Sequence, residues 1–300
     1  MNTLPSIHPM DEIPVRALQF NLDNVQFQDP LWSQTKPEFS MFINALGVHV
    51  PYFERYLIKA LSGAKKLIND EGLLSDVSHI IGQEGHHAKN FISVNRWLSK
   101  RYPEIASKDK QAKDYFAKHA KNDDMKRLLA FTAGYETFTF LGGMIVLDNH
   151  EKWFKDSDGV MTALWIWHQV EEVEHGAVAF DVYQHLYGEH EWYRKWMVLF
   201  ALSHIAKETI QSYWIMAKVE GWTRNPFTAV KKVGFCLLML SRFLKSALPV
   251  FKKDYHPRRH PMVTTKQNPI QIAWRRFERA GADVLEINHQ RLAEIMNFGK

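Results

Sequence analysis

The sequence is poor in cysteine and has no leader-like start. Its 300 residues include one cysteine, Cys236, which excludes a disulfide framework and a cysteine-based zinc site within the chain. A lone thiol is typical of a reducing compartment, so we expect a cytoplasmic protein. Residues 1–20 have no cationic start followed by an apolar core, so they do not resemble a secretory signal peptide.

Long uncharged apolar runs are also missing. Glu136 interrupts one run, Lys207 and Glu208 interrupt another, and Lys232 and Arg242 bound a third. None approaches the roughly 18 uncharged residues that a membrane-spanning helix needs, so we expect no transmembrane segment. The net charge of +5, from 38 basic and 33 acidic residues, is too small and diffuse to predict nucleic acid as a partner.

Histidine and tryptophan are plentiful instead, with 15 and 10 residues respectively. Histidine is the commonest metal ligand among side chains, so its placement bears directly on metal binding. The chain is 46% hydrophobic, and its length is ample for the core of one large domain.

Beyond residue 36 the apolar residues follow a helical period, and no alternating run predicts a strand. The predicted helices cover 37–69, 73–101, 124–149, 158–187, 190–220 and about 226–252, with a short helix inside 103–123 and a last one after Pro269. Pro51 predicts a kink or break, and Gly188 predicts the end of the 158–187 helix.

These elements predict an all-α fold, a helical bundle with additional C-terminal helices. We expect an extended N-terminal arm over 1–36 and a single helical domain over 37–300. Within that domain the core bundle would occupy 37–188 and the C-terminal helices 189–300. The long link between the second and third helices favours a bundle with a crossover connection.

Four predicted helices carry carboxylates, two of them within Glu-x-x-His pairs. In chain order these residues are Glu54, Glu84 with His87, Glu136, and Glu172 with His175. Residues three apart share one helix face, and this order matches the ligand pattern of di-iron and di-manganese bundles. The sequence therefore predicts two metal ions held by four catalytic glutamates. Carboxylates mixed with imidazoles favour iron, with manganese as the alternative.

Three residues close to the second Glu-x-x-His pair are further candidate ligands. His168 lies four residues before Glu172 and seven before His175, so all three share a stripe and His168 could be a third imidazole ligand. Glu171 and Glu174 compete with Glu172 for the carboxylate role, and spacing alone does not exclude Glu171. We favour Glu172 because it completes a Glu-x-x-His pair.

A single Glu-x-x-His pair is usually a solvated helix face, but the surroundings argue against solvent here. Glu136 is the only charged residue in 128–147, and a charge in an apolar helix is costly unless it is paired or bound to a metal. Several glutamates converging on one core would repel each other without a cation. These arguments favour the dinuclear site.

Four segments resemble the bacterial family of predicted metal-dependent hydrolases, which belongs to the ferritin-like superfamily. They are Asn44–Arg55, Ile81–His87, Tyr135–Thr139 and Trp167–Tyr183. The resemblance runs from about residue 37 to the loop at 255–257. It implies a ferritin-like bundle and a metal-dependent enzyme.

The spacing of His168, Glu172 and His175 is also similar to the fourth core helix of the arylamine N-oxygenases, which are di-iron enzymes. By that similarity the full ligand set is Glu54, Glu84, His87, Glu136, His168, Glu172 and His175.

Three functions follow from these patterns. The leading interpretation is a non-haem di-iron (or Fe/Mn) oxygenase or oxidase that uses O₂ and an unidentified electron donor on a small apolar or aromatic substrate. The alternative is a metal-dependent hydrolase that uses a metal-bound water. The third is ferritin-like iron oxidation or storage, although the long segment beyond residue 190 argues against a compact storage bundle. Aromatic residues near the ligands could line a substrate cavity or form plain bundle core: Phe131, Tyr135, Phe138, Phe140, Trp165 and Trp167.

The C-terminal region is rich in tryptophan and basic residues. Val230–Lys253 is basic at both ends and apolar between, so it could lie on a membrane surface and admit a lipid-like substrate. We favour the alternative, that it packs on the core or forms a homodimer interface. His204 either faces the metal pocket or is a hydrogen-bonded core residue, and we expect His256 and His260 at the surface.

Overall fold

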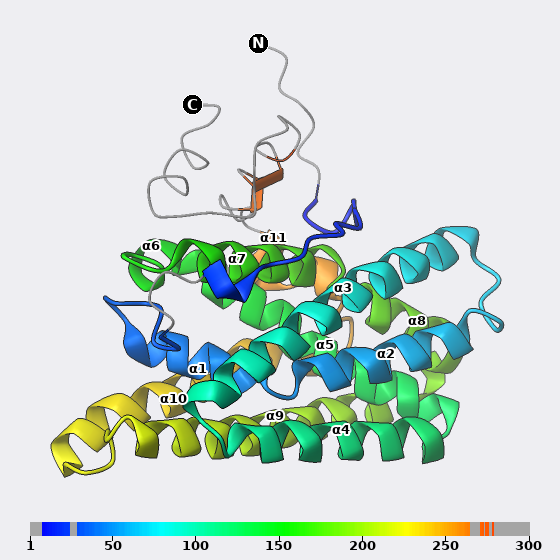
Figure 1. Cartoon of the computed structure of the whole chain (residues 1–300). Helices are drawn as coiled ribbons and strands as arrows, with labels where there is room; N and C mark the ends of the chain where they lie inside the picture. Colours follow the sequence, from blue (N-terminus) through cyan, green and yellow to red (C-terminus); the bar gives the residue numbers. More distant parts are fainter. Residues whose placement is uncertain (1–7, 25–28, 265–270, 273, 276–277, 279–300) are drawn as a thin grey trace.

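The structure is a computed structural model that describes residues 8–24, 29–264, 271–272, 274–275 and 278. This part of the chain is all-helical, with no strand beyond an isolated bridge between Ser33 and Ser157 (Figure 1). The all-α prediction is therefore confirmed, and buried clusters of Glu and His within the helices are compatible with a dinuclear metal bundle.

Four helices form the centre of the bundle: α2 (Val50–Ala64), α3 (Glu71–Arg101), α5 (Met125–Asp148) and α7 (Gly159–Glu174). α2 packs on α3 and α5, and α5 packs on α7. The link from α3 to α5 contains α4 (Ile105–Asn122), which lies along α2. This link is the expected crossover.

Three of these four helices begin at an aspartate whose carboxylate accepts a hydrogen bond from a backbone N–H of the first turn. The caps and donors are Asp70 with Leu73 (2.9 Å), Asp124 with Arg127 (2.8 Å) and Asp158 with Met161 (3.0 Å). Each cap contributes about 1 kcal/mol to helix stability. The caps fix where α3, α5 and α7 start.

Two glycines of α5 allow close approach of its neighbours. A Cβ atom at Gly143 would lie 2.9 Å from the Gln169 carbonyl oxygen of α7. One at Gly134 would lie 2.7 Å from the Met197 carbonyl oxygen of α9 (Glu191–Val219). Any side chain at these positions would push the helices apart.

The other helices surround this centre. α1 (Pro37–Gly47) packs on α9 and α10 (Pro226–Ser246), and α8 (Val178–Tyr187) packs on α5 and α3. The short elements are η1 (Leu22–Asn24), α6 (His150–Trp153), η2 (Gly188–His190), η3 (Leu248–Phe251), η4 (Pro257–Arg259) and α11 (Pro261–Thr264). Figure 1 shows the N-terminal segment in dark blue running across α7 and α3.

Several predicted helix boundaries were wrong. The predicted 37–69 helix is two helices separated at Val48–His49, and Pro51 lies in the first turn of α2, where a missing N–H costs nothing. The predicted 158–187 helix is broken between α7 and α8, next to His175. The predicted end at Gly188 is confirmed, because α8 ends at Tyr187, although Gly188 has a φ of −59° and begins η2.

The predictions for the segment 103–123 and for His260 were also wrong. The segment 103–123 holds an 18-residue helix, not a short one. His260 is buried rather than superficial, and its Nε2 lies 2.9 Å from the Ser246 carbonyl oxygen. The helix predicted after Pro269 lies largely outside the described residues.

Two helical segments are long and apolar enough to cross a membrane by length and composition alone. In α5, 89% of the most apolar window is buried inside the bundle, which explains that window as core. In Pro226–Phe251 only 33% of the window is buried. The second segment therefore keeps most of its apolar surface outside the core.

Candidate metal centre

All seven residues of the predicted ligand set lie together in two buried clusters. The first cluster contains Glu54, His87, His168 and Glu172. The second contains Glu84, Glu136, Glu172 and His175. Within each cluster the potential ligand atoms lie within 4.8 Å of one another, and Glu172 belongs to both.

The first cluster is built around two imidazoles from different helices. Nδ1 of His87 lies 3.5 Å from Oε1 of Glu172 and 3.9 Å from Oε1 of Glu54. Nε2 of His168 lies 3.0 Å and 3.5 Å from the same two oxygens. Helices α2, α3 and α7 thus each direct at least one potential metal-ligand atom to the same small region of the core.

The second cluster surrounds Nε2 of His175, just past the end of α7. This nitrogen lies 3.2 Å from one oxygen each of Glu84, Glu136 and Glu172. The break between α7 and α8 places His175 at the helix end, where its ring reaches α3 and α5 carboxylates.

Two glutamates face both clusters. Oε2 of Glu84 lies 3.3 Å from Nδ1 of His87, and its Oε1 lies 3.2 Å from Nε2 of His175. Glu172 likewise directs Oε1 to His168 and Oε2 to His175. Both carboxylates are therefore placed to bridge two cations, while Glu54 and Glu136 each belong to one cluster.

The outer nitrogens of two imidazoles are held by acceptors. Nδ1 of His175 lies 2.9 Å from the amide oxygen of Gln83, and Nε2 of His87 lies 2.8 Å from Oε2 of Glu171. Because both partner oxygens accept, these outer nitrogens donate to them, and the inner nitrogens point at the cluster carboxylates. Metal-binding histidines use the same arrangement.

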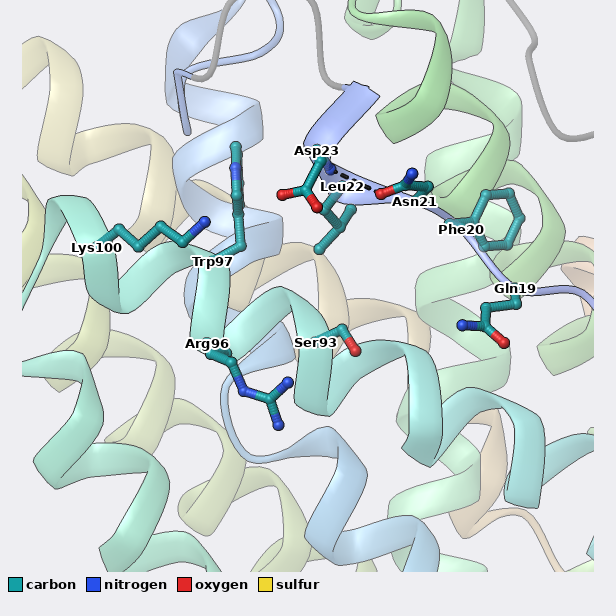
Figure 2. Close-up of a pocket in the computed structure, with 9 residues that line it drawn as sticks. All are labelled: Gln19, Phe20, Asn21, Leu22, Asp23, Ser93, Arg96, Trp97 and Lys100. Carbon is teal, nitrogen blue, oxygen red and sulfur yellow. Dashed lines mark hydrogen bonds between the residues drawn. The ribbon is translucent and has the colours of Figure 1, made fainter.

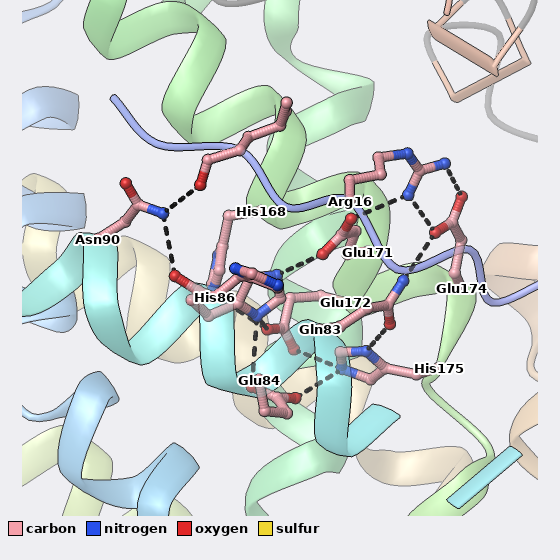
Figure 3. A network of polar contacts seen from close by, with 12 residues as sticks. Arg16, Gln83, Glu84, His86, Asn90, His168, Glu171, Glu172, Glu174 and His175 are labelled. Atoms are coloured by element: carbon pink, nitrogen blue, oxygen red, sulfur yellow. Dashed lines mark hydrogen bonds and ion pairs between the residues drawn. The ribbon is translucent and has the colours of Figure 1, made fainter. Parts of the chain in front are cut away.

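A buried arginine of the N-terminal arm ties these acceptors together. Nη1 of Arg16 donates to Oε1 of Glu171 (3.0 Å) and to Oε2 of Glu174 (2.7 Å), and Nη2 donates to Oε1 of Glu174 (3.0 Å). Gln83 donates from its amide nitrogen to Glu174 at 3.2 Å. Figure 3 shows one chain of contacts running from Arg16 through Glu174 and Gln83 to His175.

Arg16 was not predicted as part of the site, although two of its partners were named as candidate ligands. Glu171 and Glu174, the rivals of Glu172, lie outside the two clusters and both pair with Arg16. Three acidic residues at a fully buried helix end require a cation. The acidic run at the end of α7 could therefore have indicated a buried basic partner.

Several buried polar atoms of the clusters face only one another and form no hydrogen bond within the described part of the chain. Both carboxylate oxygens of Glu54, Oε1 of Glu84, Oε2 of Glu136 and Nε2 of His168 are buried without a hydrogen-bond partner. Burial raises the pKa of Glu54 to about 7 and that of Glu136 to about 8. Converging, unpaired carboxylates in a core are stabilised by cations, so these residues fit a pair of divalent metal ions.

Comparison with known families agrees with this chemistry. Residues 14–261 match the family described as predicted metal-dependent hydrolase. The chain belongs to this family. No curated protein and no solved structure matches it. Membership supports a metal-dependent enzyme and gives no support to the oxygenase reaction.

In this family member a small cavity of about 40 Å³ adjoins the first cluster at His168. Its walls are mostly apolar and include Phe138, Trp165 and Tyr135 from the expected aromatic set. The other three aromatics of that set are buried but do not line this cavity. The hydroxyl of Tyr135 hydrogen-bonds to Nδ1 of His204, so His204 contacts the cavity wall and not the clusters.

A larger, open pocket of about 610 Å³ lies between the arm and α3 (Figure 2). None of the seven cluster residues is among the described residues that line it. Phe20 of its wall packs on Trp167 with ring centroids 5.4 Å apart, and Trp167 lies 4.8 Å from the ring of His87. These two aromatic layers separate the pocket from the first cluster.

Proposed function

We propose that this member of the hydrolase family is a dinuclear metal enzyme whose seven cluster residues hold two divalent cations. One observation carries the proposal: four buried glutamates and three buried histidines converge, and several of their inner atoms form no hydrogen bond within the described residues. Iron suits this mixture of carboxylate and imidazole donors, and manganese is the alternative. The donor pattern is that of ferritin-like carboxylate bundles.

The two sites of the proposed centre would differ in their donors. The first would use Glu54, His87 and His168, and the second would use Glu136 and His175. Glu84 and Glu172 would be shared. Bound cations would supply Lewis acidity and activate a water molecule or O₂. The outer contacts of His87 and His175 would hold these rings in the metal-binding tautomer.

Hydrolysis is the reaction class that we propose first, because the family carries that description. The sequence alone favours an oxygenase, and the family match reverses this order. Besides His168, the cavity wall presents His49 and Tyr135 to a ligand. Nδ1 of His49 is buried without a hydrogen-bond partner, so it is available to orient a substrate polar group.

Oxygen activation is the second candidate, and the cavity next to His168 favours it. A cavity of about 40 Å³ has room for a few water-sized molecules at most, because one water needs roughly 10–15 Å³ of such space. An apolar space of this size suits a diatomic molecule better than a polar ester or amide. Iron storage remains a third prediction from the sequence.

Metal analysis and two activity assays test the proposal. We expect elemental analysis of the purified protein to find about two metal ions per chain, and Glu172→Ala to lose both. The exposed Glu71→Ala is the matched control and should keep them. A Glu172→Ala protein that still held two metals would contradict the ligand assignment.

The reaction class is tested on the same preparations. Hydrolysis of ester and phosphodiester probes by the metal-loaded protein, without O₂ uptake, would support the first candidate. Consumption of O₂ by the ferrous protein, measured with an oxygen electrode and absent in Glu172→Ala, would support the second.

A further inference from the structure

The outer side of α10 and the start of η3 carry a row of exposed apolar side chains. Phe227, Val230, Leu237, Leu244 and Leu248 are all exposed, Phe227 by 86% and Val230 by 77%. Their spacing of three, seven, seven and four residues places them on one side of a helix. Large apolar side chains gathered in this way on a surface mark an interaction site.

The opposite side of α10 is fixed in the core. Phe235 and Phe243 are buried and both contact the ring of Phe42 of α1, at centroid distances of 6.3 and 6.2 Å. Phe243 also lines the small cavity beside His168. The exposed apolar row and the cavity wall are therefore two sides of one helix.

The charge of this segment has one sign. Residues 226–253 contain six basic residues and no acidic one. Lys232 is occupied by Glu38 at 2.8 Å, and Arg242 lies over the ring of Trp153. The remaining cations are exposed, and among the described residues none forms an ion pair: Lys231, Lys245, Lys252 and Lys253.

We propose that the exposed row of α10, flanked by these four lysines, docks on the surface of an anionic lipid membrane. A helix with an apolar face lies in the interface and buries that face at the boundary between headgroups and acyl chains. Anionic headgroups supply the negative charge that this surface lacks. Figure 1 shows α10 at the edge of the bundle, where a flat surface can reach it.

A second copy of the chain fits this surface less well. A two-fold interface pairs a patch with itself, so it would bring the lysines of two copies together with no carboxylate from residues 226–253 between them. Like charges at an interface oppose association. Charge complementarity thus selects the membrane over the homodimer.

Vesicle co-sedimentation of the full chain tests the proposal. We expect binding to phosphatidylcholine vesicles that contain phosphatidylserine, weak binding without phosphatidylserine, and a decrease with added salt. Lys231→Ala/Lys245→Ala should weaken binding about 30-fold. Val230→Glu/Leu237→Glu should abolish it while the circular dichroism spectrum is retained, because both side chains are exposed.

The matched control is Leu67→Glu, an equally exposed apolar position in the α2–α3 link, away from α10 in Figure 1. This variant should bind vesicles like the wild type. The proposal is overturned if the wild type does not co-sediment with anionic vesicles or binds neutral vesicles equally well. It is also overturned if sedimentation finds a dimer that Val230→Glu/Leu237→Glu converts to monomers.

Discussion

At the scale of single residues, Arg16 holds the side chains that orient one histidine of each cluster. Its guanidinium neutralises Glu171 and Glu174, which are fully buried. Replacing it by glutamine leaves Glu171 without its arginine, while Glu174 keeps only Arg275, whose Nε lies 2.8 Å from its Oε1. Because breaking a buried ion pair leaves an uncompensated charge, we expect a loss of about 3–5 kcal/mol in unfolding free energy. Because Glu171 and Gln83 orient His87 and His175, metal affinity should also fall by about 10–100-fold. Urea unfolding and metal titration measure the two effects.

The arm itself offers the control for this prediction. Arg258→Gln removes another arm contact, in which Arg258 pairs with Asp11 and bonds to the Met10 carbonyl oxygen, but it touches neither cluster. It should leave metal affinity unchanged. Arg16→Lys, which keeps the charge but not the fork of donors, should recover part of the affinity. Equal metal affinities in Arg16→Gln and wild type would show that Arg16 stabilises the arm alone.

His204 predicts a pH dependence of stability. Burial lowers its pKa from 6.5 to about 4 in the folded protein, so the unfolded chain takes up a proton first as the pH falls. Stability is therefore lost between about pH 6.5 and pH 4. From about pH 7 to pH 5 the expected loss is about 2 kcal/mol. His204→Gln, which keeps an acceptor for Tyr135, should remove this part of the loss in urea unfolding; parallel losses in both proteins would refute the assignment.

The sequence predicted the inner residues of the site but not the outer ones, for a physical reason. Glu84 with His87 and Glu172 with His175 are local patterns, because a helix alone brings residues three apart to one face. The contact between Arg16 and Glu171 spans 155 residues and depends on how an irregular arm crosses the bundle. No local pattern encodes such a crossing.

At the scale of the elements, the spacing between α5 and α7 decides whether Glu136 and Glu172 meet. A methyl group at Gly143 would lie 2.9 Å from the Gln169 carbonyl oxygen and 3.1 Å from Cγ2 of Val173. Gly143→Ala should therefore separate the helices, cost about 1–3 kcal/mol of stability and lower the metal content. Thermal unfolding and elemental analysis test this prediction.

Gly85 of α3 is the matched control, since no atom lies within 4 Å of a Cβ built there. Gly85→Ala should be neutral or stabilise the helix by about 0.5–1 kcal/mol, although it adjoins Glu84. Destabilisation by both substitutions to the same extent would mean that helix spacing is not the cause.

The break between α7 and α8 and the length of α4 were not predictable from the apolar pattern. An apolar period continues across residues 174–178, so the pattern predicts one helix. The structure breaks it between Glu174 and Val178. Within this break Gly176 lies against Phe140, where a Cβ atom would be 2.9 Å from that side chain. The glycine was visible in the sequence, but its partner on α5 was not. In α4, the few buried positions, such as Ile105 and Phe116, gave too weak a period to define the full helix.

At the scale of the whole molecule, four helices converge on carboxylates that repel one another without cations. Chelation should therefore lower the stability of the entire bundle and not of one helix. With metal at about 100 times its dissociation constant, the expected gain is roughly 2.7 kcal/mol. Calorimetry with and without added Mn²⁺ or Fe²⁺ measures it, and Glu172→Gln should respond less. A metal-independent unfolding temperature in the wild type would count against the dinuclear centre.

The contact between Arg16 and the end of α7 also sets an order of events during synthesis. Arg16 is made early, but Glu171 and Glu174 follow it by 155 and 158 residues. At about 5–20 residues per second the arm waits roughly 8–30 s for its partners. Until then Gln83 and the α3 ligands have no fixed orientation from the arm. The arm is thus synthesised well before the residues that hold it in place, and the outer contacts of the metal centre form only after α7 has been made.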